Sequence, residues 1–386
     1  MKKIIVGIVG SKFAAELHVN AYEQNKEYYE IVGVCSRHRK NAEIFAKKHK
    51  IKRVYENVNE MVSSKEIDVV DICSATNSHE EIILKAIDYG KNIICEKPLL
   101  GYFGDGSVDK ELMLEDVKKK VERIERKMKE SSVKFLYAEN LLFSPVLTKI
   151  KRMLEASNFG ILDIRSEVSH SGSQAEYAKR WMSSGGGSLL RNGSHAIAVA
   201  LHLKAIGGKY LYGRPIKIEN VFANTGFLTK TETFKKTKKD NYIKNVYDVE
   251  DWSTAILEFE DGTKAVVFSN DVSLGGVRNY IQVTTSKSVI YGNITPNNTL
   301  ISYTPNGEIW DKEFISEKLE TKSGWNFPAP DDIWIRGFSQ EFKEFARSLS
   351  DDKEFYSDFQ FAKEIILTIY SAYVSAQNGE KVKVEV

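Results

Sequence analysis

The sequence predicts an α/β protein with two domains: a parallel sheet covered by helices on both faces, followed by a largely antiparallel sheet. The first 140 residues alternate between apolar strand-like runs and helix-like stretches, which is typical of parallel sheets. After about residue 140 the pattern changes to strand–turn–strand units. The length of 386 residues is enough for two domains with a sizeable core.

The first part contains five expected strands and three expected helices. The strands are residues 3–10, 30–37, 68–76, 92–99 and 133–140. The helical stretches are residues 40–49, 79–90 and 109–130. The second of these ends at Gly90, a suitable C-cap. In the third, apolar residues recur at helical spacing and the rest are charged, which predicts a long amphipathic helix.

The second part begins its strand pattern most clearly at residues 253–269. Two apolar runs flank Asp261-Gly262 there, the strongest short hairpin signal. Residues 279–293 and 299–310 show further strand–turn–strand patterns. Two helices are expected at the C-terminus. The apolar stripe of the first is Trp334, Phe338, Phe342, Phe345 and Leu349, and that of the second is Ile365, Ile366, Ile369 and Tyr373.

Composition excludes several classes of partner. The net charge of +2 offers no electrostatic case for nucleic acid or a membrane surface, and no apolar run reaches membrane-spanning length. No signal peptide is visible, so a cytoplasmic protein is expected. Cys35, Cys73 and Cys95 lie far apart in apolar runs, which favours buried packing over a metal site.

The turn at residues 10–15, Gly-Ser-Lys-Phe-Ala-Ala, follows the first strand and opens a helix. Free N–H groups and the helix dipole at such a turn favour phosphate. Gly10 permits the tight turn, but Lys12 stands where a dinucleotide fingerprint has its middle glycine. Lys12 either obstructs the pyrophosphate or adds a cation beside it. The candidate cofactor-binding residues here are Gly10, Ser11, Lys12, Phe13 and Ala14.

The end of the second strand bears on the choice of dinucleotide. A carboxylate at this place binds the ribose 2′-hydroxyl of NAD, but this chain has Ser36 and Arg37, followed by His38 and Arg39. Because an arginine pairs with a 2′-phosphate, the sequence favours NADP over NAD. In the alternative interpretation these arginines are solvated loop charges and either cofactor is accepted.

Three motifs then point to a family. Glu96-Lys97-Pro98 follows a buried strand, the glycine-rich run 185–203 contains His195, and the chain closes with the pattern of residues 370–384. Together with the N-terminal turn, they resemble the glucose–fructose oxidoreductase / inositol dehydrogenase family (Gfo/Idh/MocA). The resemblance covers essentially the whole chain.

The resemblance implies a Rossmann dinucleotide-binding domain at residues 1–139. It implies a substrate-binding and oligomerisation domain at residues 140–386, with a large, mostly antiparallel open sheet. The substrate would lie between the domains. Similar proteins transfer a hydride between NAD(P) and a secondary hydroxyl or keto carbon of a sugar, glycoside or polyol, and are homodimers or homotetramers.

The resemblance also assigns roles to residues. Lys97 matches the active-site lysine and His195 the catalytic histidine, and a cis peptide bond is implied before Pro98. A histidine suits the proton transfer, and a lysine ammonium stabilises the developing alkoxide. The further cofactor-binding residues are Ala75, Thr76, Asn77, His79 and Glu96, together with Lys97 itself.

The chain departs from the family at Arg191, four residues before His195. Many relatives have an aspartate there. Arg191 either receives an anionic group of the substrate, as a bidentate arginine can, or points away and pairs with a structural acid. Asn192 beside it is a second candidate for substrate binding.

Three other residues are candidates for substrate binding: His170, Arg180 and Asn140. No metal is expected. Residues 101–113 are either a mobile flap or a surface insertion. The lysine-rich stretch 229–244 is either a solvated loop or a basic lip for an anionic substrate.

Two rival functions remain open from the sequence. In one, a tightly bound cofactor oxidises a glycoside transiently before elimination and cleavage. In the other, the protein senses dinucleotides without catalysis, and Lys12 and Arg191 mark a degenerate site.

Overall fold

The computed structural model describes residues 3–157, 160–173, 175–237, 242–243, 245–351 and 355–386. Part of the lysine-rich stretch, residues 238–241 and 244, therefore lies outside the described residues. The chain forms two compact units. Unit 1 comprises residues 1–101, 115–143 and 337–366. Unit 2 comprises residues 102–114, 144–336 and 367–386.

Unit 1 contains a six-stranded sheet in the order β3-β2-β1-β4-β5-β6, and all of its pairings are parallel. Its strands are β1 (Ile4–Val9), β2 (Tyr29–Cys35), β3 (Arg53–Val54), β4 (Val69–Ile72), β5 (Asn92–Glu96) and β6 (Phe135–Ala138). The five strands expected from the sequence are present, and the expected Rossmann fold is confirmed. This strand order reverses between β1 and β4, and ligands of such sheets bind at the carboxyl ends of the strands at that point.

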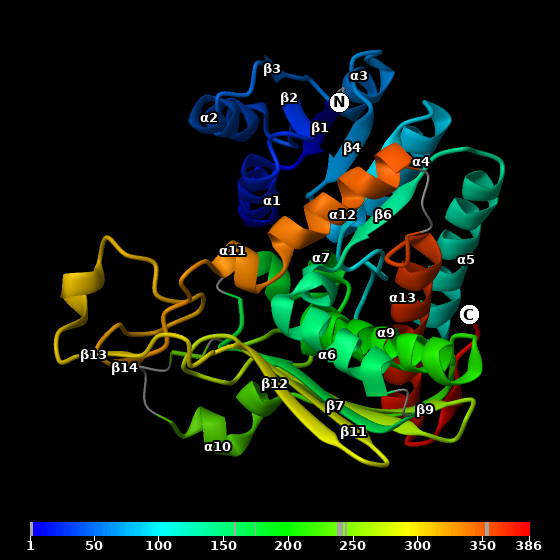
Figure 1. The fold of residues 1–386 in the computed structure, drawn as a ribbon, viewed down its shortest axis with the longest axis vertical. Coiled ribbons are helices and arrows are strands. Elements are labelled where there is room, and N and C mark those ends of the chain that lie inside the picture. The colour runs from blue at the N-terminus through cyan, green and yellow to red at the C-terminus, as the bar shows by residue number, and fades with distance from the viewer. Residues whose placement is uncertain (1–2, 158–159, 174, 238–241, 244, 352–354) are drawn as a thin grey trace. The chain divides into compact units, whose positions relative to one another are not determined.

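The helices of unit 1 from the first 130 residues alternate with these strands, and Figure 1 shows them in colours from blue to teal; one further helix of the unit, at residues 338–351, is orange. They are α1 (Phe13–Gln24), α2 (Arg39–His49), α3 (Val58–Ser63), α4 (His79–Asp88), the larger part of α5 (Lys110–Lys129) and α12 (Phe338–Asp351). The three helices predicted in this half agree with α2, α4 and α5 to within two residues at each end. The alternation of apolar strand-like and helix-like segments in the sequence therefore predicted these elements correctly.

Helix α12 belongs to unit 1 although it follows the second sheet in the sequence. The Phe342 ring is fully buried and lies with its centroid 4.9 Å from that of His18 and 4.5 Å from that of Tyr22. Tyr29 donates a hydrogen bond to the Phe342 carbonyl at 2.6 Å. The expectation from the sequence is one domain for residues 140–386. The aromatic packing of α12 on α1 instead returns residues 337–366 to the first unit.

Unit 2 contains a seven-stranded sheet in the order β12-β11-β7-β10-β9-β8-β15. Its strands are β7 (Ile161–Ser169), β8 (Ile218–Gly226), β9 (Trp252–Phe259), β10 (Lys264–Asn270), β11 (Arg278–Thr285), β12 (Val289–Thr295) and β15 (Val382–Lys383). The pairing is antiparallel except between β7 and β10. The mostly antiparallel sheet predicted for this half is confirmed. Both hairpins expected at residues 253–269 and 279–293 are present.

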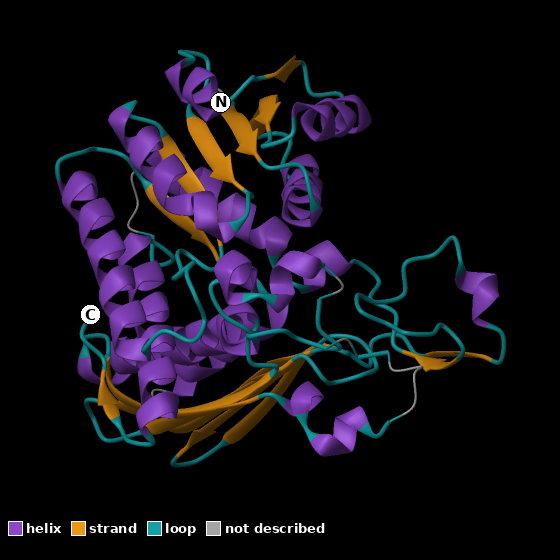
Figure 2. Ribbon diagram, turned by 180° about the vertical axis from the view of Figure 1, so that it is seen from behind, coloured by secondary structure: helices purple, strands orange, loops and turns teal. Residues whose placement is uncertain are grey.

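Helices cover one face of this sheet (Figure 2). They include α6 (Pro145–Ser157) and α9 (Gly193–Tyr212), which pack on the sheet and on each other. The other helices of the chain are α7 (Trp181–Ser184), α8 (Ser188–Arg191), α10 (Glu232–Lys235), α11 (Asp332–Ile335) and α13 (Phe359–Asn378), and α13 divides between the two units. The apolar stripe expected from Trp334 to Leu349 is split between α11 and α12. Gly337, with φ of 94°, separates the two helices.

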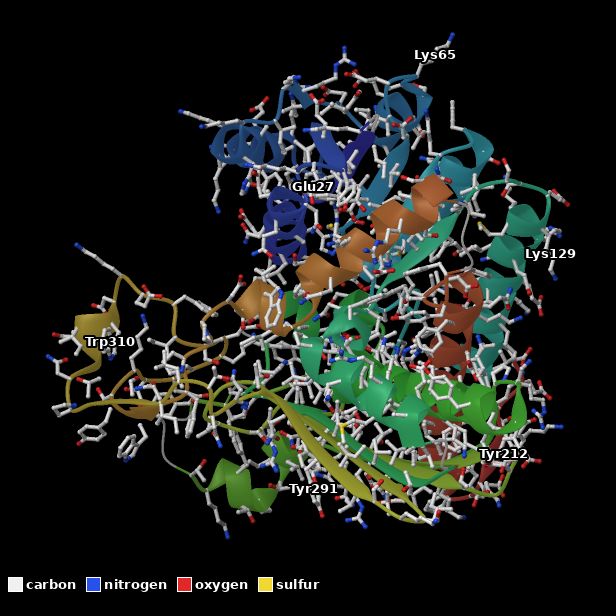
Figure 3. All side chains as sticks on the ribbon, viewed as in Figure 1. Glu27, Lys65, Lys129, Tyr212, Tyr291 and Trp310 are labelled. Carbon is white, nitrogen blue, oxygen red and sulfur yellow. The ribbon has the colours of Figure 1, made fainter. Side chains whose placement is uncertain are left out.

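The predicted strand–turn–strand pattern at residues 299–310 is wrong. Strand β13 (Ser302–Thr304) is followed by a 3₁₀ helix, Gly307–Trp310, and pairs instead with β14 (Gly324–Asn326). The Asn306 side chain accepts a hydrogen bond from the Glu308 N–H at 3.0 Å and so caps that helical turn. Tyr303 and Trp325 on this small sheet are 58% and 70% exposed. Figure 3 labels Trp310 in the same region, and Tyr291 on β12.

The segment expected as a flap or an insertion, residues 101–113, is attached to other parts of unit 2. The Tyr102 N–H donates to the Tyr370 hydroxyl at 2.6 Å. The Lys110 ammonium lies 4.3 Å from the centroid of the Trp181 ring. These contacts fix both ends of the segment. Among the described helices, none combines the length and apolar character needed to cross a membrane.

Replacing Phe342 by alanine is expected to destabilise the protein by about 3–5 kcal/mol, because it removes a buried aromatic ring and leaves a cavity. Urea-induced unfolding, followed by fluorescence and circular dichroism, measures the loss. Leu112→Ala is the control, because Leu112 is 64% exposed and its replacement should change stability by less than about 0.5 kcal/mol. Equal effects of the two substitutions would contradict the packing described for α12.

Candidate active site

The turn after β1 is shaped for a close approach of backbone to ligand. Gly10 has a φ of +123°, which side chains other than glycine rarely adopt. A Cβ on Gly10 would lie 2.6 Å from the Cys73 carbonyl oxygen and 3.0 Å from the Ser74 nitrogen. The turn therefore presses against the carboxyl end of β4, at the reversal of strand order. Only glycine fits there.

The start of α1 offers unused hydrogen-bond donors. Lys12 is its N-cap residue, and its side chain makes no capping hydrogen bond. The N–H groups of the first turn and the positive end of the helix dipole therefore remain open to an anion. Lys12 and Phe13 are both exposed. A hollow of about 240 Å³ lies beside this turn, lined by Ser11, Lys12, Glu16, Asn41, Ile44, Phe45 and Lys48. These features fit a dinucleotide phosphate.

The loop after β2 provides an exposed cation next to this turn. The Ser11 hydroxyl donates to the Ser36 hydroxyl at 3.1 Å, which joins the two loops. Arg39 is paired with Glu43, at 2.9 Å, and with Glu56. Arg37 is exposed and forms no ion pair with any residue that the structure describes. Its charge is therefore available for a ligand.

A buried polar cluster lies behind this turn, and the sequence analysis missed it. His18 on α1 is fully buried. Its Nδ1 lies 2.9 Å from an Asp71 oxygen and its Nε2 lies 3.1 Å from Glu96 Oε1. Tyr22 donates to Asp71 at 3.0 Å. Burial alone would lower the pKa of His18, but the charge of Asp71 and their hydrogen bond outweigh it and raise that pKa well above its usual value. The imidazolium form is favoured.

Glu96 connects this cluster to the lysine motif. Its Oε2 accepts the Lys97 backbone N–H at 2.9 Å, while Oε1 contacts His18. The Lys97–Pro98 peptide bond is cis, as the resemblance implied. The Glu96 carboxylate therefore holds the backbone of the residue whose side chain is the candidate for catalysis. The assignment of Glu96 to the cofactor stays a prediction.

His18, Asp71 and Cys73 also form a group in which one ligand atom of each lies within 4.8 Å of the others, a spacing that a metal ion can use. Here the atoms make hydrogen bonds to one another, since the Cys73 sulfur lies 3.2 Å from His18 Nδ1. Burial and the nearby carboxylate raise the pKa of the Cys73 thiol. The protonated thiol is a poor metal ligand, so the geometry favours a hydrogen-bond network.

The loop after β4 places its candidate residues differently. Ala75 and Asn77 are exposed and Thr76 is half-buried, just after the carboxyl end of β4. The His79 side chain is 1% exposed and its two ring nitrogens lie 3.2 Å from the carbonyl oxygens of Leu99 and Ser74. Burial lowers the pKa of His79. This ring joins two loops inside the unit, and its assignment to the cofactor stays a prediction.

His195 lies in the first turn of α9 in unit 2 and is half-buried. The glycine run before it is held by Glu250, which the sequence analysis missed. The Glu250 carboxylate accepts the N–H groups of Gly187, at 3.0 Å, and Leu189, at 2.9 Å, and the hydroxyl of Tyr373, at 2.9 Å. Burial raises the pKa of Glu250 to about 7.

This contact explains one glycine of the run. A Cβ on Gly187 would lie 1.9 Å from the Glu250 carbonyl oxygen, so this position accepts only glycine. Because α8 and α9 begin within a few residues of it, Glu250 sets where Arg191 and His195 stand in unit 2.

Three of the predicted substrate residues meet at one carboxylate, that of Asp271. Arg191 donates to Asp271 Oδ2, Asn192 donates to Oδ1 at 3.0 Å, and His170 Nδ1 lies 3.6 Å from Oδ1. Arg191 therefore pairs with an acid, Asp271, as one of the two interpretations of this residue predicts. Nothing in the sequence around Asp271 indicated this role.

The other two predicted substrate residues lie elsewhere. Arg180 is exposed, and its guanidinium lies 4.2 Å from the centroid of the Tyr247 ring. Asn140 opens a 3₁₀ helix, Asn140–Phe143, in unit 1 and is 5% exposed. Their roles toward substrate stay predictions.

The missed cluster had a signal in the sequence. His18 and Tyr22 stand one helical turn apart, on the face of α1 that also carries Ala15 and Val19. Asp71 interrupts the apolar strand β4. A polar residue in the apolar face of each of two adjacent elements suggests that they pair inside the core.

Comparison with known proteins identifies the family. Residues 4–132 match the family described as "Oxidoreductase family, NAD-binding Rossmann fold" (GFO_IDH_MocA), and residues 147–291 match its "GFO/IDH/MocA C-terminal domain". The chain belongs to the GFO/IDH/MocA oxidoreductase family. It is therefore an oxidoreductase whose Rossmann fold binds NAD-type dinucleotides.

Two curated relatives share little of their sequence with this chain. The chain is 22% identical over 340 residues to the myo-inositol 2-dehydrogenase of Thermotoga maritima, covering 87% of this chain and 85% of that enzyme. It is 31% identical over 102 residues to the uncharacterised protein YMR315W of Saccharomyces cerevisiae. That match covers only 26% of this chain and 29% of the yeast protein.

Solved structures share the fold over the whole chain. GenD2 from gentamicin A biosynthesis, in complex with NAD, has a TM-score of 0.80 at 18% identity and covers 100% of this chain and 97% of that one. Levoglucosan dehydrogenase in complex with NADH has a TM-score of 0.74 at 18% identity and covers 100% of both chains. At this identity the likeness concerns the fold.

Replacing Gly10 by alanine is expected to weaken dinucleotide binding at least tenfold, because the new Cβ meets the Cys73 carbonyl and the backbone must leave its positive φ. Titration with NADPH, followed by nicotinamide fluorescence, measures the change. Gly90→Ala is the matched control. Gly90 also has a positive φ, of 64°, but a Cβ there meets nothing within 4 Å. It should cost about 1–2 kcal/mol of stability with no loss of binding.

Proposed function

We propose that this chain is an NADP(H)-preferring oxidoreductase that transfers a hydride between nicotinamide and a secondary hydroxyl or keto carbon of a sugar, glycoside or polyol. The observation that carries the proposal is the family membership, with Lys97 and His195 at the motif positions. The relatives named myo-inositol 2-dehydrogenase and levoglucosan dehydrogenase support the substrate class. The oligomeric state and the cytoplasmic location stay predictions.

The Rossmann unit fits the cofactor on its own geometry. The glycine-only turn at Gly10, the open first-turn N–H groups of α1 and the exposed charge of Arg37 all suit a phosphorylated dinucleotide. When bound, the nicotinamide accepts or supplies the hydride. The proton transfer and the stabilisation of charge on the substrate oxygen are left to side chains of the protein.

We assign these two tasks to His195 and Lys97. We assign to the His195 imidazole the proton that leaves the substrate hydroxyl, because histidine exchanges protons near neutral pH. The Lys97 ammonium donates a hydrogen bond to the same oxygen and stabilises negative charge as it develops there. Glu96 supports Lys97 through the backbone N–H, and Glu250 supports the glycine run that leads to His195.

The preference for NADP rests on the loop after β2. No carboxylate follows the strand, and Ser36 and Arg37 stand there instead. A 2′-phosphate gains a charge-assisted hydrogen bond from a guanidinium, whereas a free 2′-hydroxyl gains less from it. Because the Arg39 charge is already used by Glu43 and Glu56, Arg37 is the residue expected to discriminate.

Arg37→Ala is therefore expected to weaken NADPH binding about 10- to 100-fold, since a hydrogen bond to a charged group contributes about 1.5–3 kcal/mol. NADH affinity should change less than threefold. Arg39→Ala is the matched control and should leave both affinities within threefold. Fluorescence titration of the purified protein, after any bound cofactor has been removed, measures all four values.

Equal affinity of the unchanged protein for NADPH and NADH would contradict the preference while leaving the oxidoreductase function intact. An equal loss in both arginine variants would show that the loop acts through its total charge.

His195→Ala is expected to lower kcat about 10²- to 10⁴-fold, the usual contribution of a general acid–base. NADPH affinity should change less than threefold. Lys97→Met should lower kcat to a similar extent, and the double variant should lose less than the product of the two single losses, because both groups act on one oxygen. A screen of sugars and polyols by nicotinamide absorbance supplies the substrate.

If His195→Ala loses NADPH binding together with turnover, His195 has a structural role and the assignment of proton transfer to it is wrong.

A further inference from the structure

Asp271 and His170 are brought together by the parallel pair in the second sheet. Strands β7 and β10 run side by side in the same direction, with Ser169 opposite Asn270 at their carboxyl ends. The next residue of each strand, His170 and Asp271, therefore leaves the sheet at the same edge. The Asn270 side chain donates to the Ser169 hydroxyl at 3.1 Å and ties the two strand ends together.

The Asp271 carboxylate is fixed in place. Asp271 is 4% exposed, and its own N–H donates to the Asp251 carbonyl at 2.8 Å. Its two oxygens accept from Arg191 and from Asn192. A carboxylate so buried and so bonded cannot swing away to free its partners without a large cost.

The charge of Arg191 is consequently balanced inside unit 2. It pairs with Asp271, and its side chain is only 15% exposed. The second carboxyl group nearby, that of Glu250, also interacts with Arg191, whose charge acts to lower the Glu250 pKa against the larger effect of burial. An incoming carboxylate would meet a cation that a fixed acid already neutralises.

The same arrangement suits uncharged hydroxyl groups. The guanidinium of Arg191 is a donor and the carboxylate of Asp271 is an acceptor. The amide of Asn192 already donates to the Asn270 carbonyl and to Asp271. The Nδ1 of His170 already accepts the Gly172 N–H at 2.9 Å, so in the neutral ring Nε2 is the donor. A hydroxyl group is both donor and acceptor, so neighbouring hydroxyls of a sugar or polyol can match such a mixed surface without bringing charge.

We infer that the Arg191–Asp271 pair makes this enzyme select uncharged polyhydroxyl substrates over their carboxylate analogues, with Asp271 as the residue that sets the selection. The inference rests on the proposed function and narrows its substrate class. It also opposes the expectation that Arg191 receives an anionic group. In this scheme Arg191 becomes an anion receptor only when the Asp271 charge is removed.

Matched sugars test the inference. D-Glucose and D-glucuronate, and D-galactose and D-galacturonate, differ only in a hydroxymethyl or a carboxylate group at one carbon. The unchanged protein should show a kcat/KM at least tenfold higher for the uncharged member of any pair that it oxidises. Asp271→Asn should shift that ratio at least tenfold toward the uronate. Arg191→Gln combined with Asp271→Asn should abolish the shift, because the receptor is then gone.

Calorimetric binding of the uronates gives a readout that needs no turnover. Binding to D271N at least tenfold tighter than to the unchanged protein, and lost again in the R191Q/D271N double variant, supports the inference. If the unchanged protein oxidises no member of either pair or of the wider sugar screen, the proposed function fails, but this binding pattern still decides the role of Asp271.

If D271N does not fold, the single variant Arg191→Gln tests the inference instead, because Asp271 keeps its hydrogen bond from Asn192 in that variant. By the inference, uronate binding to R191Q is no weaker than to the unchanged protein. A tenfold weakening would show that Arg191 receives the carboxylate and would overturn the inference. Two other results would also overturn the inference. One is a preference of the original protein for the uronate, and the other is a ratio of kcat/KM values in D271N equal to that of the original protein.

Discussion

The buried imidazole of His18, held between two carboxylates, is the interaction on which the first unit depends. It joins α1 to β4 through Asp71 and to β5 through Glu96, the elements that surround the reversal of strand order. Charged groups can stay in such a place only as partners, because removing one member leaves an uncompensated charge at a cost of about 3–5 kcal/mol. The cluster is closed by α12, whose Phe342 ring covers His18.

The same cluster contains Glu341, also on α12, which is fully buried. Its carboxyl oxygens find no hydrogen-bond partner among the described residues. Burial raises the pKa of Glu341 well above its usual value, and the carboxylates of Glu96, Glu139 and Asp71 add to this effect. The neutral acid is therefore the stable form. A protonated Glu341 adds no further negative charge beside Asp71 and Glu96, which already share the His18 imidazolium.

Unit 2 uses buried carboxyl groups for a related purpose. Glu250 binds the backbone of the glycine run, and Asp271 binds the side chains that follow it. Each acid fixes the position of candidate site residues: Glu250 holds the run that leads to His195, and Asp271 holds Arg191 and Asn192. The departures from the family pattern at Lys12 and Arg191 have different outcomes. Lys12 stays exposed beside an open helix N-terminus, whereas Arg191 acquires an internal partner.

The sequence by itself determined the features that depend on neighbours along the chain. The alternation of strands and helices over the first 140 residues, the hairpins of unit 2 and the turn at Gly10 could be predicted, because local periodicity and turn chemistry specify them. The role expected of Lys97 came from the resemblance to a known family. Tertiary structure decided which distant residues meet. His18 and Asp71 are 53 residues apart, and Arg191 and Asp271 are 80 apart. A polar residue in an apolar face, such as His18 or Asp71, indicates a buried partner but does not say which residue that partner is. The partner is decided only when strands align and helices pack, and for the same reason α12 could not be placed in unit 1 from its sequence.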